Sequence, residues 1–141
     1  MKRYNKSKEY VSILTPCYNC EEYIGVYLEK ILKQTYDYIE LVIVNDGSSD
    51  RTEEIVFEYR DKIERRGYKL NYYKQDNGGV GEAIRQGLKI MTGTYFCWCD
   101  CDNFYDDSYV QKKVDIFVSN PHCNIVRCDG YLFYEGDVHH P

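Results

Sequence analysis

Short, nearly continuous apolar runs alternate along the chain with segments in which apolar residues recur every three or four positions. Such runs favour strands buried in a parallel sheet, and the recurrence favours amphipathic helices. We expect four strands, at residues 11–14, 39–44, 68–74 and 94–99, and weaker candidates at 125–126 and 131–133. The expected inward residues of the helices are Ile24, Tyr27, Leu28, Ile31 and Leu32; Ile55, Val56, Tyr59 and Ile63; Val80, Ile84, Leu88 and Met91; and Val110, Val114, Phe117 and Val118.

Polar residues and glycines mark the ends of the expected helices. Asn19 and Asp50 are the expected N-caps of the first two helices, and each is followed three residues later by a glutamate. The second helix should run over residues 52–64 and stop at Gly67, and the third should stop at Gly93.

Strands that alternate with helices across short loops indicate βαβ units with right-handed crossovers. The predicted fold class is therefore α/β, with a mostly parallel central sheet and helices on both faces. In such sheets, ligands bind outside the carboxyl ends of the strands. That rule selects four loops, at residues 15–19, 45–50, 75–79 and 100–106, which also hold many of the polar and glycine residues.

Composition and charge narrow the classes of protein. A chain of 141 residues fits one domain, and 43% hydrophobic with 16% aromatic residues argues against disorder. A net charge of −5 argues against binding to nucleic acid. We expect no membrane span, because no apolar run approaches about 20 residues. Seven cysteines, an odd number, favour a reduced and cytoplasmic protein.

Two carboxylates stand at the end of the fourth strand, in Asp100-Cys101-Asp102. Carboxylates separated by one residue can converge on one hard divalent cation, whose shell is commonly completed by substrate phosphates. The alternative interpretation is a solvated acidic turn.

The other three loops offer groups suited to a nucleotide. Tyr18 could stack on a base, or it could be a packed loop residue. Asp46 could accept a hydrogen bond from a base N–H, or it could form an Asx-turn. Asn77-Gly78-Gly79, before a helix, could place backbone N–H groups near an anion.

The cysteines allow more than one interpretation. Cys17 and Cys20 have the spacing of a redox motif, while Cys97, Cys99 and Cys101 share one face of a strand. We favour buried structural thiols, because three cysteines along one strand do not make a tetrahedral zinc site. A cysteine-based metal or redox protein is the weaker alternative.

Taken together, the ordered motifs resemble the N-terminal half of a family 2 glycosyltransferase of GT-A fold. The resemblance covers about residues 10–110. The matching stretches are Val11-Ser12-Ile13-Leu14-Thr15-Pro16-Cys17-Tyr18-Asn19, Glu40-Leu41-Val42-Ile43-Val44-Asn45-Asp46-Gly47-Ser48-Ser49-Asp50, Asn77-Gly78-Gly79 with its helix to Gly93, and Asp100-Cys101-Asp102.

The resemblance implies a nucleotide-sugar donor, usually a UDP-sugar. By position, Pro16 and Tyr18 would flank the base and Asp46 would bond to its edge. Asn77 and Gly78 would lie near the nucleotide.

The resemblance also implies a metal-dependent transfer of the sugar to an acceptor hydroxyl, usually with inversion. Asp100 and Cys101 would lie by the ribose and phosphates. Asp102 would be the main ligand of Mn²⁺ or Mg²⁺, with Asp100 as the second. The acceptor would be a saccharide, a lipid-linked molecule or a protein. Cell-surface polysaccharide synthesis, at the inner face of the membrane, is one such setting.

The chain departs from the family pattern in two respects. Asn103 stands where many relatives carry a further acid, and the general base is expected beyond Pro141. We expect a basic N-terminal tail at residues 1–9. A nucleotide-sugar-binding domain follows at 10–141, without the acceptor-binding half. The alternative is a non-catalytic nucleotide-binding or interaction domain.

Overall fold

The computed structural model describes residues 9–128, and in this part of the chain four parallel strands form one sheet in the order β3-β2-β1-β4. The strands are β1 (Val11–Cys17), β2 (Ile39–Asn45), β3 (Lys69–Lys74) and β4 (Tyr95–Trp98). The helices between and after them are α1 (Glu21–Leu32), α2 (Thr52–Glu58), α3 (Arg60–Arg65), α4 (Val80–Ile90) and α5 (Tyr109–Ser119).

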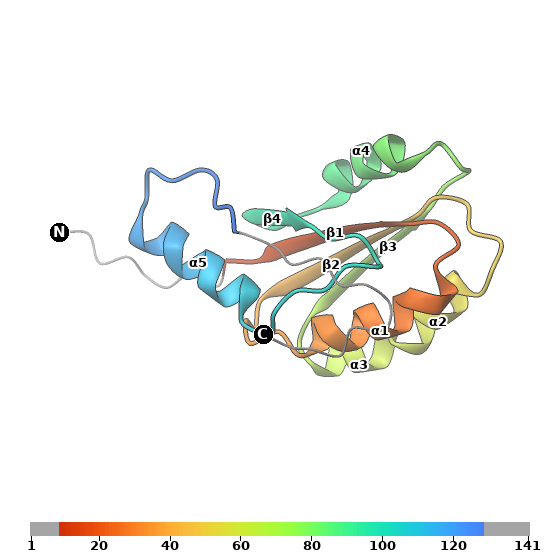
Figure 1. The fold of residues 1–141 in the computed structure, drawn as a ribbon, viewed down its shortest axis with the longest axis horizontal. Coiled ribbons are helices and arrows are strands. Elements are labelled where there is room, and N and C mark those ends of the chain that lie inside the picture. The colour runs from red at the N-terminus through yellow and green to blue at the C-terminus, as the bar shows by residue number, and fades with distance from the viewer. Residues whose placement is uncertain (1–8, 129–141) are drawn as a thin grey trace.

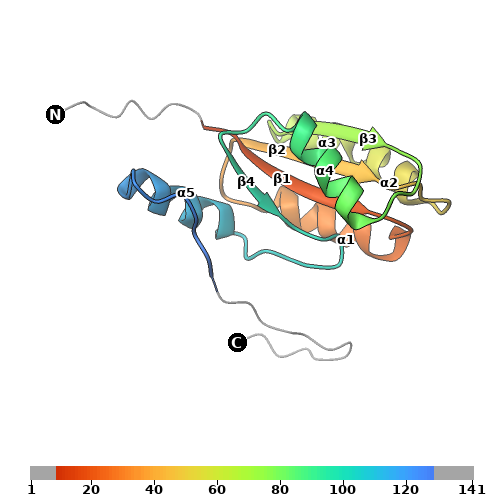
Figure 2. The ribbon, with the colours of Figure 1, turned by 90° about the horizontal axis from the view of Figure 1, so that it is seen from above.

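The sheet has helices on both faces, which confirms the predicted α/β class. Helices α1, α2 and α3 lie on one face and α4 lies on the other (Figures 1 and 2). Helix α5 joins the first layer, since its Val110 and Val114 belong to the same core cluster as α1. Residues 1–8 of the expected tail at 1–9 and the strand candidate at 131–133 lie outside the described residues, and 125–126 form no strand.

The two central strands carry the core. Every residue of β1 and of β2 is buried, because each strand has a neighbour on both edges and helices on both faces. Side chains alternate between the layers, so Ile13 faces the α1 cluster while Leu14 faces α4. The polar side chains of these two strands are buried as well, at Ser12, Thr15, Glu40 and Asn45.

Strand β1 continues past the expected end at residue 14 and includes Pro16. The Cys99 N–H donates to the Leu14 carbonyl at 3.0 Å, so the backbone groups of Leu14 point toward the β4 side of β1. Backbone groups two residues apart point the same way along a strand, so those of Pro16 also face the β4 side. Strand β4 ends at Trp98, opposite Leu14. The missing N–H of Pro16 therefore removes no ladder hydrogen bond.

The expected helix over residues 52–64 is divided into α2 and α3 at Tyr59. Its end is as expected: Gly67 has φ 86°, and its N–H donates to the Glu64 carbonyl at 2.9 Å. The Tyr68 N–H donates to the Ile63 carbonyl at 3.1 Å, which completes a Schellman motif.

Helix α4 packs differently from the prediction. Its buried residues are Ala83 and Gly87, whereas Val80 and Leu88 are exposed. Val118, at the end of α5, is exposed as well. In α4 the reason is close approach: a Cβ on Gly87 would lie 2.0 Å from Cδ1 of Leu14. Small residues therefore bring this helix onto the sheet, and the larger apolar residues lie beside the contact.

Gly93 lets the segment between α4 and β4 pass close to the backbone at the start of β1, and it does not terminate α4. Helix α4 ends at Ile90, and a Cβ on Gly93 would meet the Ser12 N and the Tyr10 O at 2.7 Å each. Buried Glu40 secures the crossing by accepting hydrogen bonds from the Ser12 hydroxyl at 2.5 Å and the Thr92 N–H at 2.7 Å. Burial alone would raise the pKa of Glu40, but these bonds hold it below its usual value.

No helix among the described residues is long and apolar enough to cross a membrane.

Substitution of two glycines in α4 tests the close packing of this helix. We expect Gly87→Ala to lower the free energy of unfolding by about 1–3 kcal/mol, because fully buried Leu14 must move. Gly81→Ala is the matched control, since its Cβ would have no neighbour within 4 Å. The control should be neutral or stabilising by up to about 1 kcal/mol. Urea unfolding measures both, and equal effects would contradict this packing.

Candidate functional site

The carboxyl ends of the strands meet at one edge of the sheet. Cys17 lies in register with Asn45, and Asn45 with Lys74. Two backbone hydrogen bonds of 2.9 Å join the segments that follow, from the Asp46 N–H to the Cys17 carbonyl and from the Gln75 N–H to the Asn45 carbonyl. The four loops selected from the sequence therefore leave the sheet at one edge.

Asp46 holds the third loop in place. This residue is 3% exposed. Its Oδ1 accepts hydrogen bonds from Gln75 Nε2 at 2.8 Å and from the Gly78 N–H at 2.9 Å, and its Oδ2 accepts one from the Gly79 N–H at 2.8 Å. A carboxylate has about four acceptor positions, so about one remains on Oδ2 for a ligand.

The hydrogen bonds to Asp46 also change the interpretation of the glycine loop at residues 77–79. The Gly78 and Gly79 N–H groups are both paired with Asp46, so the anion-binding role suggested for them is not supported. The loop also lies against Gly47, where a Cβ would stand 2.8 Å from the Asn77 N. Three predicted site residues, Asp46, Asn77 and Gly78, are thus brought together.

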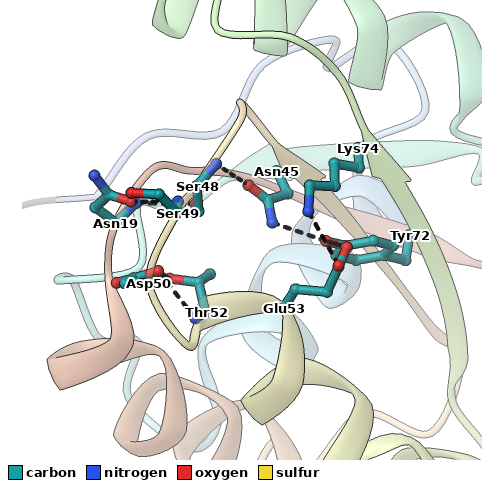
Figure 3. Close-up of polar contacts among 9 residues, drawn as sticks. All are labelled: Asn19, Asn45, Ser48, Ser49, Asp50, Thr52, Glu53, Tyr72 and Lys74. Atoms are coloured by element: carbon teal, nitrogen blue, oxygen red, sulfur yellow. Dashed lines mark hydrogen bonds and ion pairs between the residues drawn. The ribbon is translucent and has the colours of Figure 1, made fainter.

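Asn19 joins the first loop to the second and does not cap α1. Its N–H donates to the Ser48 hydroxyl and its Oδ1 accepts from the Ser49 N–H, both at 2.9 Å (Figure 3). Its φ of 48° is a left-handed conformation that Asn tolerates. The expected capping by Asn19 was therefore wrong, because its side chain has partners in another loop.

Asp50 serves the starts of two helices. Its Oδ1 accepts from the Thr52 N–H at 3.0 Å, as expected for α2, and its Oδ2 accepts from the Glu21 N–H of α1 at 2.9 Å. The Arg51 N–H returns a hydrogen bond to the Glu21 side chain at 2.8 Å. Partial burial would raise the pKa of Asp50, but hydrogen bonds from Thr52 and Glu21 hold it below its usual value.

A polar network that the sequence did not reveal supports the second loop. Asn45 accepts from the Ser48 N–H at 2.8 Å and donates to the Tyr72 hydroxyl at 2.8 Å (Figure 3). Tyr72 donates to Glu53 at 2.7 Å, and Lys74 lies 3.0 Å from the same carboxylate. Glu53 therefore pairs with β3 instead of completing a cap. Its pKa is lowered by the hydrogen bonds from Tyr72 and Lys74.

At the first strand, the two residues expected to flank a base differ in accessibility. Pro16 is buried within β1, whereas Tyr18 is 54% exposed. Of the pair, Tyr18 is the one whose ring is free to stack on a ligand.

The acidic loop after β4 has one paired and one exposed carboxylate. The Trp98 indole N–H donates to Asp100 Oδ1 at 2.8 Å, and Asp102 is exposed. Cys101 is turned toward the core and packs against the α1 cluster. Within residues 9–128 no group of three or more His, Cys, Asp or Glu side chains could hold a metal. If these two aspartates bind a Mg²⁺ or Mn²⁺ ion, its other ligands must come from substrate and water.

The parallel sheet, its helices on both faces and these loops at the carboxyl ends of its strands define an α/β protein of Rossmann-like type. The chain belongs to glycosyl transferase family 2, whose model matches residues 12–140. An uncharacterised glycosyltransferase of Rickettsia typhi is 35% identical over 129 residues, which make up 92% of this chain and 38% of that protein. The glycosyltransferase GlyA of Streptococcus pneumoniae is 36% identical over 118 residues, 78% of this chain and 16% of that one.

Solved structures agree in fold. A crystal structure of S. aureus TarS in complex with UDP-GlcNAc matches with a TM-score of 0.72 and 27% identity, over 80% of this chain and 32% of that one. A mannosyltransferase from Pyrobaculum calidifontis matches with a TM-score of 0.62 at 24% identity. The resemblance to family 2 and the GT-A fold are thereby confirmed. The chain spans about two-fifths or less of the length of the relatives described here.

Replacing Asp50 tests the shared start of α1 and α2. Asp50→Ala should lower the free energy of unfolding by about 1–2 kcal/mol, because N–H groups of both helices lose their acceptor. Since its folded pKa lies below the ordinary 3.8, this contribution is present above that pH and is lost as pH falls through the lowered pKa.

Denaturant unfolding between pH 7 and pH 2 provides the measurement. The variant should differ most from the parent at pH 7 and converge with it in acid. The control is Ser49→Ala, which keeps the backbone bond to Asn19. A difference between variant and parent that is constant with pH would contradict the role of the Asp50 carboxylate.

Proposed function

We propose that this chain is the donor-binding part of a metal-dependent glycosyltransferase that uses a nucleotide-diphosphate sugar, a UDP-sugar in the first instance. The observation that carries the proposal is the meeting of Tyr18, Asp46 and the Asp100–Asp102 loop at one edge of the sheet. Support comes from the likeness to TarS, which was crystallised with UDP-GlcNAc.

Each residue has a distinct task in this proposal. Tyr18 stacks on the base, Pro16 lies beneath it in β1, and Asp46 uses its remaining acceptor position on a base N–H. Asn77 and Gly78, held by the Asp46 loop, line the nucleotide on its other side.

The Asp100–Asp102 loop would bind the metal ion that neutralises the charge of the donor diphosphate. Asp102 is the main ligand of Mn²⁺ or Mg²⁺, and Asp100 contributes the carboxylate oxygen that Trp98 leaves free. Cys101 lies by the ribose through its backbone. A divalent cation at this position would neutralise the charge that develops on the leaving diphosphate. The residues that bind the acceptor, and the general base that activates its hydroxyl, would lie in the part of the relatives that this chain does not span.

The product of the proposed reaction is a glycoside of a saccharide, a lipid-linked molecule or a protein. We further propose that the transfer inverts the configuration at the anomeric carbon. The reaction would serve cell-surface polysaccharide synthesis and use a donor from the cytoplasm. Turnover of a UDP-sugar is measured as UDP release in the presence of candidate acceptors. Nucleotide binding without turnover in the full-length gene product would assign it to the class of non-catalytic nucleotide-binding modules.

Donor and metal binding can be measured by thermal unfolding. UDP with Mn²⁺, at about a hundred times the dissociation constant, should add about 2.7 kcal/mol to the free energy of unfolding. Asp102→Ala should abolish the Mn²⁺ dependence. Asp107→Ala is the control, because Asp107 is an exposed acid nearby whose backbone carbonyl, not its side chain, accepts a hydrogen bond from the Thr35 N–H. Absence of stabilisation by any nucleoside diphosphate with Mn²⁺ would refute the proposal.

The stacking role of Tyr18 has its own test. Tyr18→Ala should weaken UDP binding by about 5- to 150-fold, which corresponds to the ~1–3 kcal/mol of one stacked base. Titration calorimetry with UDP and Mn²⁺ gives the value. Tyr23→Ala removes a similarly exposed tyrosine, 49% against 54%, from α1 and should leave the affinity unchanged. Equal losses in the two variants would remove Tyr18 from the base site.

A further inference from the structure

The backbone is fixed where β4 ends and the Asp100–Asp102 loop begins. The Cys99 N–H donates to the Leu14 carbonyl of β1 at 3.0 Å, so hydrogen bonding to β1 continues one residue past the strand. The Trp98 carbonyl accepts a hydrogen bond from the Tyr105 hydroxyl at 2.5 Å, which ties the end of β4 to the segment before α5. The loop therefore starts from a defined position.

The loop itself is closed by one turn. The Asn103 N–H donates to the Asp100 carbonyl at 3.1 Å, so residues 100–103 form a β-turn. Asp100 is the first residue of this turn and Asp102 is the third. The two carboxylates consequently leave the backbone at neighbouring points, and the direction of each side chain decides whether both can reach one ion.

Trp98 and Asp100 lie on the same side of the chain. Side chains alternate along an extended segment, and Cys97 and Cys99 pack into the core on the α1 face of the sheet. Trp98 is in register with Leu14, which packs with α4 on the opposite face. Asp100 follows Trp98 by two residues, and its Oδ1 accepts a hydrogen bond from the indole N–H at 2.8 Å.

Burial alone does not hold the Trp98 ring in place. Its side is 51% exposed, since α4 packs over β1 and β2 on this face, beside β4. A hydrogen bond from an N–H to a carboxylate is charge-assisted and about twice as strong as a neutral one. The bond occupies one acceptor position of Asp100 Oδ1 and restrains rotation of the carboxylate, which leaves Oδ2 for another partner.

We propose that Trp98 is a positioning residue for the divalent cation of the donor site, and that it acts by orienting the Asp100 carboxylate. The inference rests on the proposed function, which assigns the cation to Asp100 and Asp102. Carboxylate oxygens suit Mn²⁺ and Mg²⁺, and carboxylates that bind a metal are commonly oriented by hydrogen bonds from groups that do not touch it. Loss of such a partner typically costs about 10- to 100-fold in metal affinity.

Replacement of Trp98 tests this role through UDP binding with and without metal. Trp98→Phe keeps an aromatic ring and removes the N–H. We expect the gain in UDP affinity that Mn²⁺ provides to fall by about 10-fold or more, because Asp100 is no longer oriented. UDP affinity in the presence of a metal chelator should not change, whereas a general disturbance of the fold would lower both affinities. Titration calorimetry of the whole chain measures them.

Phe96→Leu is the matched control. Phe96 lies two residues before Trp98 in β4 and is 56% exposed, so it is a similarly accessible aromatic residue of the same strand. Its replacement should leave both UDP affinities unchanged. A loss in Phe96→Leu as large as that in Trp98→Phe would overturn the proposal.

A double variant separates action through Asp100 from an independent effect of the ring. Asp100→Ala by itself should reduce the gain in UDP affinity that Mn²⁺ provides. Adding Trp98→Phe to Asp100→Ala should cause no further loss, because the indole no longer has a carboxylate to orient. Losses that add in the double variant would contradict the positioning role.

Trp98 is the only tryptophan of the chain, so its fluorescence reports on this site directly. Bound Mn²⁺ is paramagnetic and should quench the emission in the presence of UDP, whereas Mg²⁺ should not. Binding of Mn²⁺ that calorimetry detects without quenching would place the cation away from Trp98 and overturn the inference. Absence of any gain from Mn²⁺ in the parent chain would instead refute the proposed metal-dependent function, so the two failures are distinguishable.

Discussion

The loop after β2 is tied by carboxylate hydrogen bonds to the loops on both sides, and the candidate site depends on this constraint. Asp46 binds the third loop through Gln75, Gly78 and Gly79, and Asp50 binds the start of α1. A carboxylate that accepts several N–H bonds is far better defined in position than a solvated one. The edge of the sheet is therefore an organised surface, on which exposed Tyr18 and Asp102 have a fixed frame.

This constraint divides the acidic residues by task. Asp46, Asp50, Glu40 and Glu53 use their oxygens inside the protein, on loops, helix starts and the crossing into β4. In the proposed donor site, Asp102 and one oxygen of Asp100 would be left for the cation. The net charge of −5 therefore reflects internal hydrogen bonding as much as it reflects solubility or ligand binding.

Periodicity in the sequence predicted the elements well where large residues make the contact. The stripe of α1 is largely correct, since Ile24, Tyr27, Leu28 and Ile31 are all buried there. The same reasoning failed in α4, because a helix that packs through Ala83 and Gly87 places its large residues beside the contact. It also failed for Pro16, whose place in β1 depends on where the neighbouring strand ends.

By itself the sequence determined the α/β class, the order of the strands along the chain and the four loops that follow the carboxyl ends of the strands. Those features follow from local pattern, since hydrophobic period and turn residues act over a few positions. Only the tertiary structure decided the partners of the polar groups. It turned Asn19 from a helix cap into a bridge to Ser49 and paired Glu53 with Tyr72 of β3. These two bonds join residues 30 and 19 positions apart, and no local pattern specifies which distant donor an acceptor will meet.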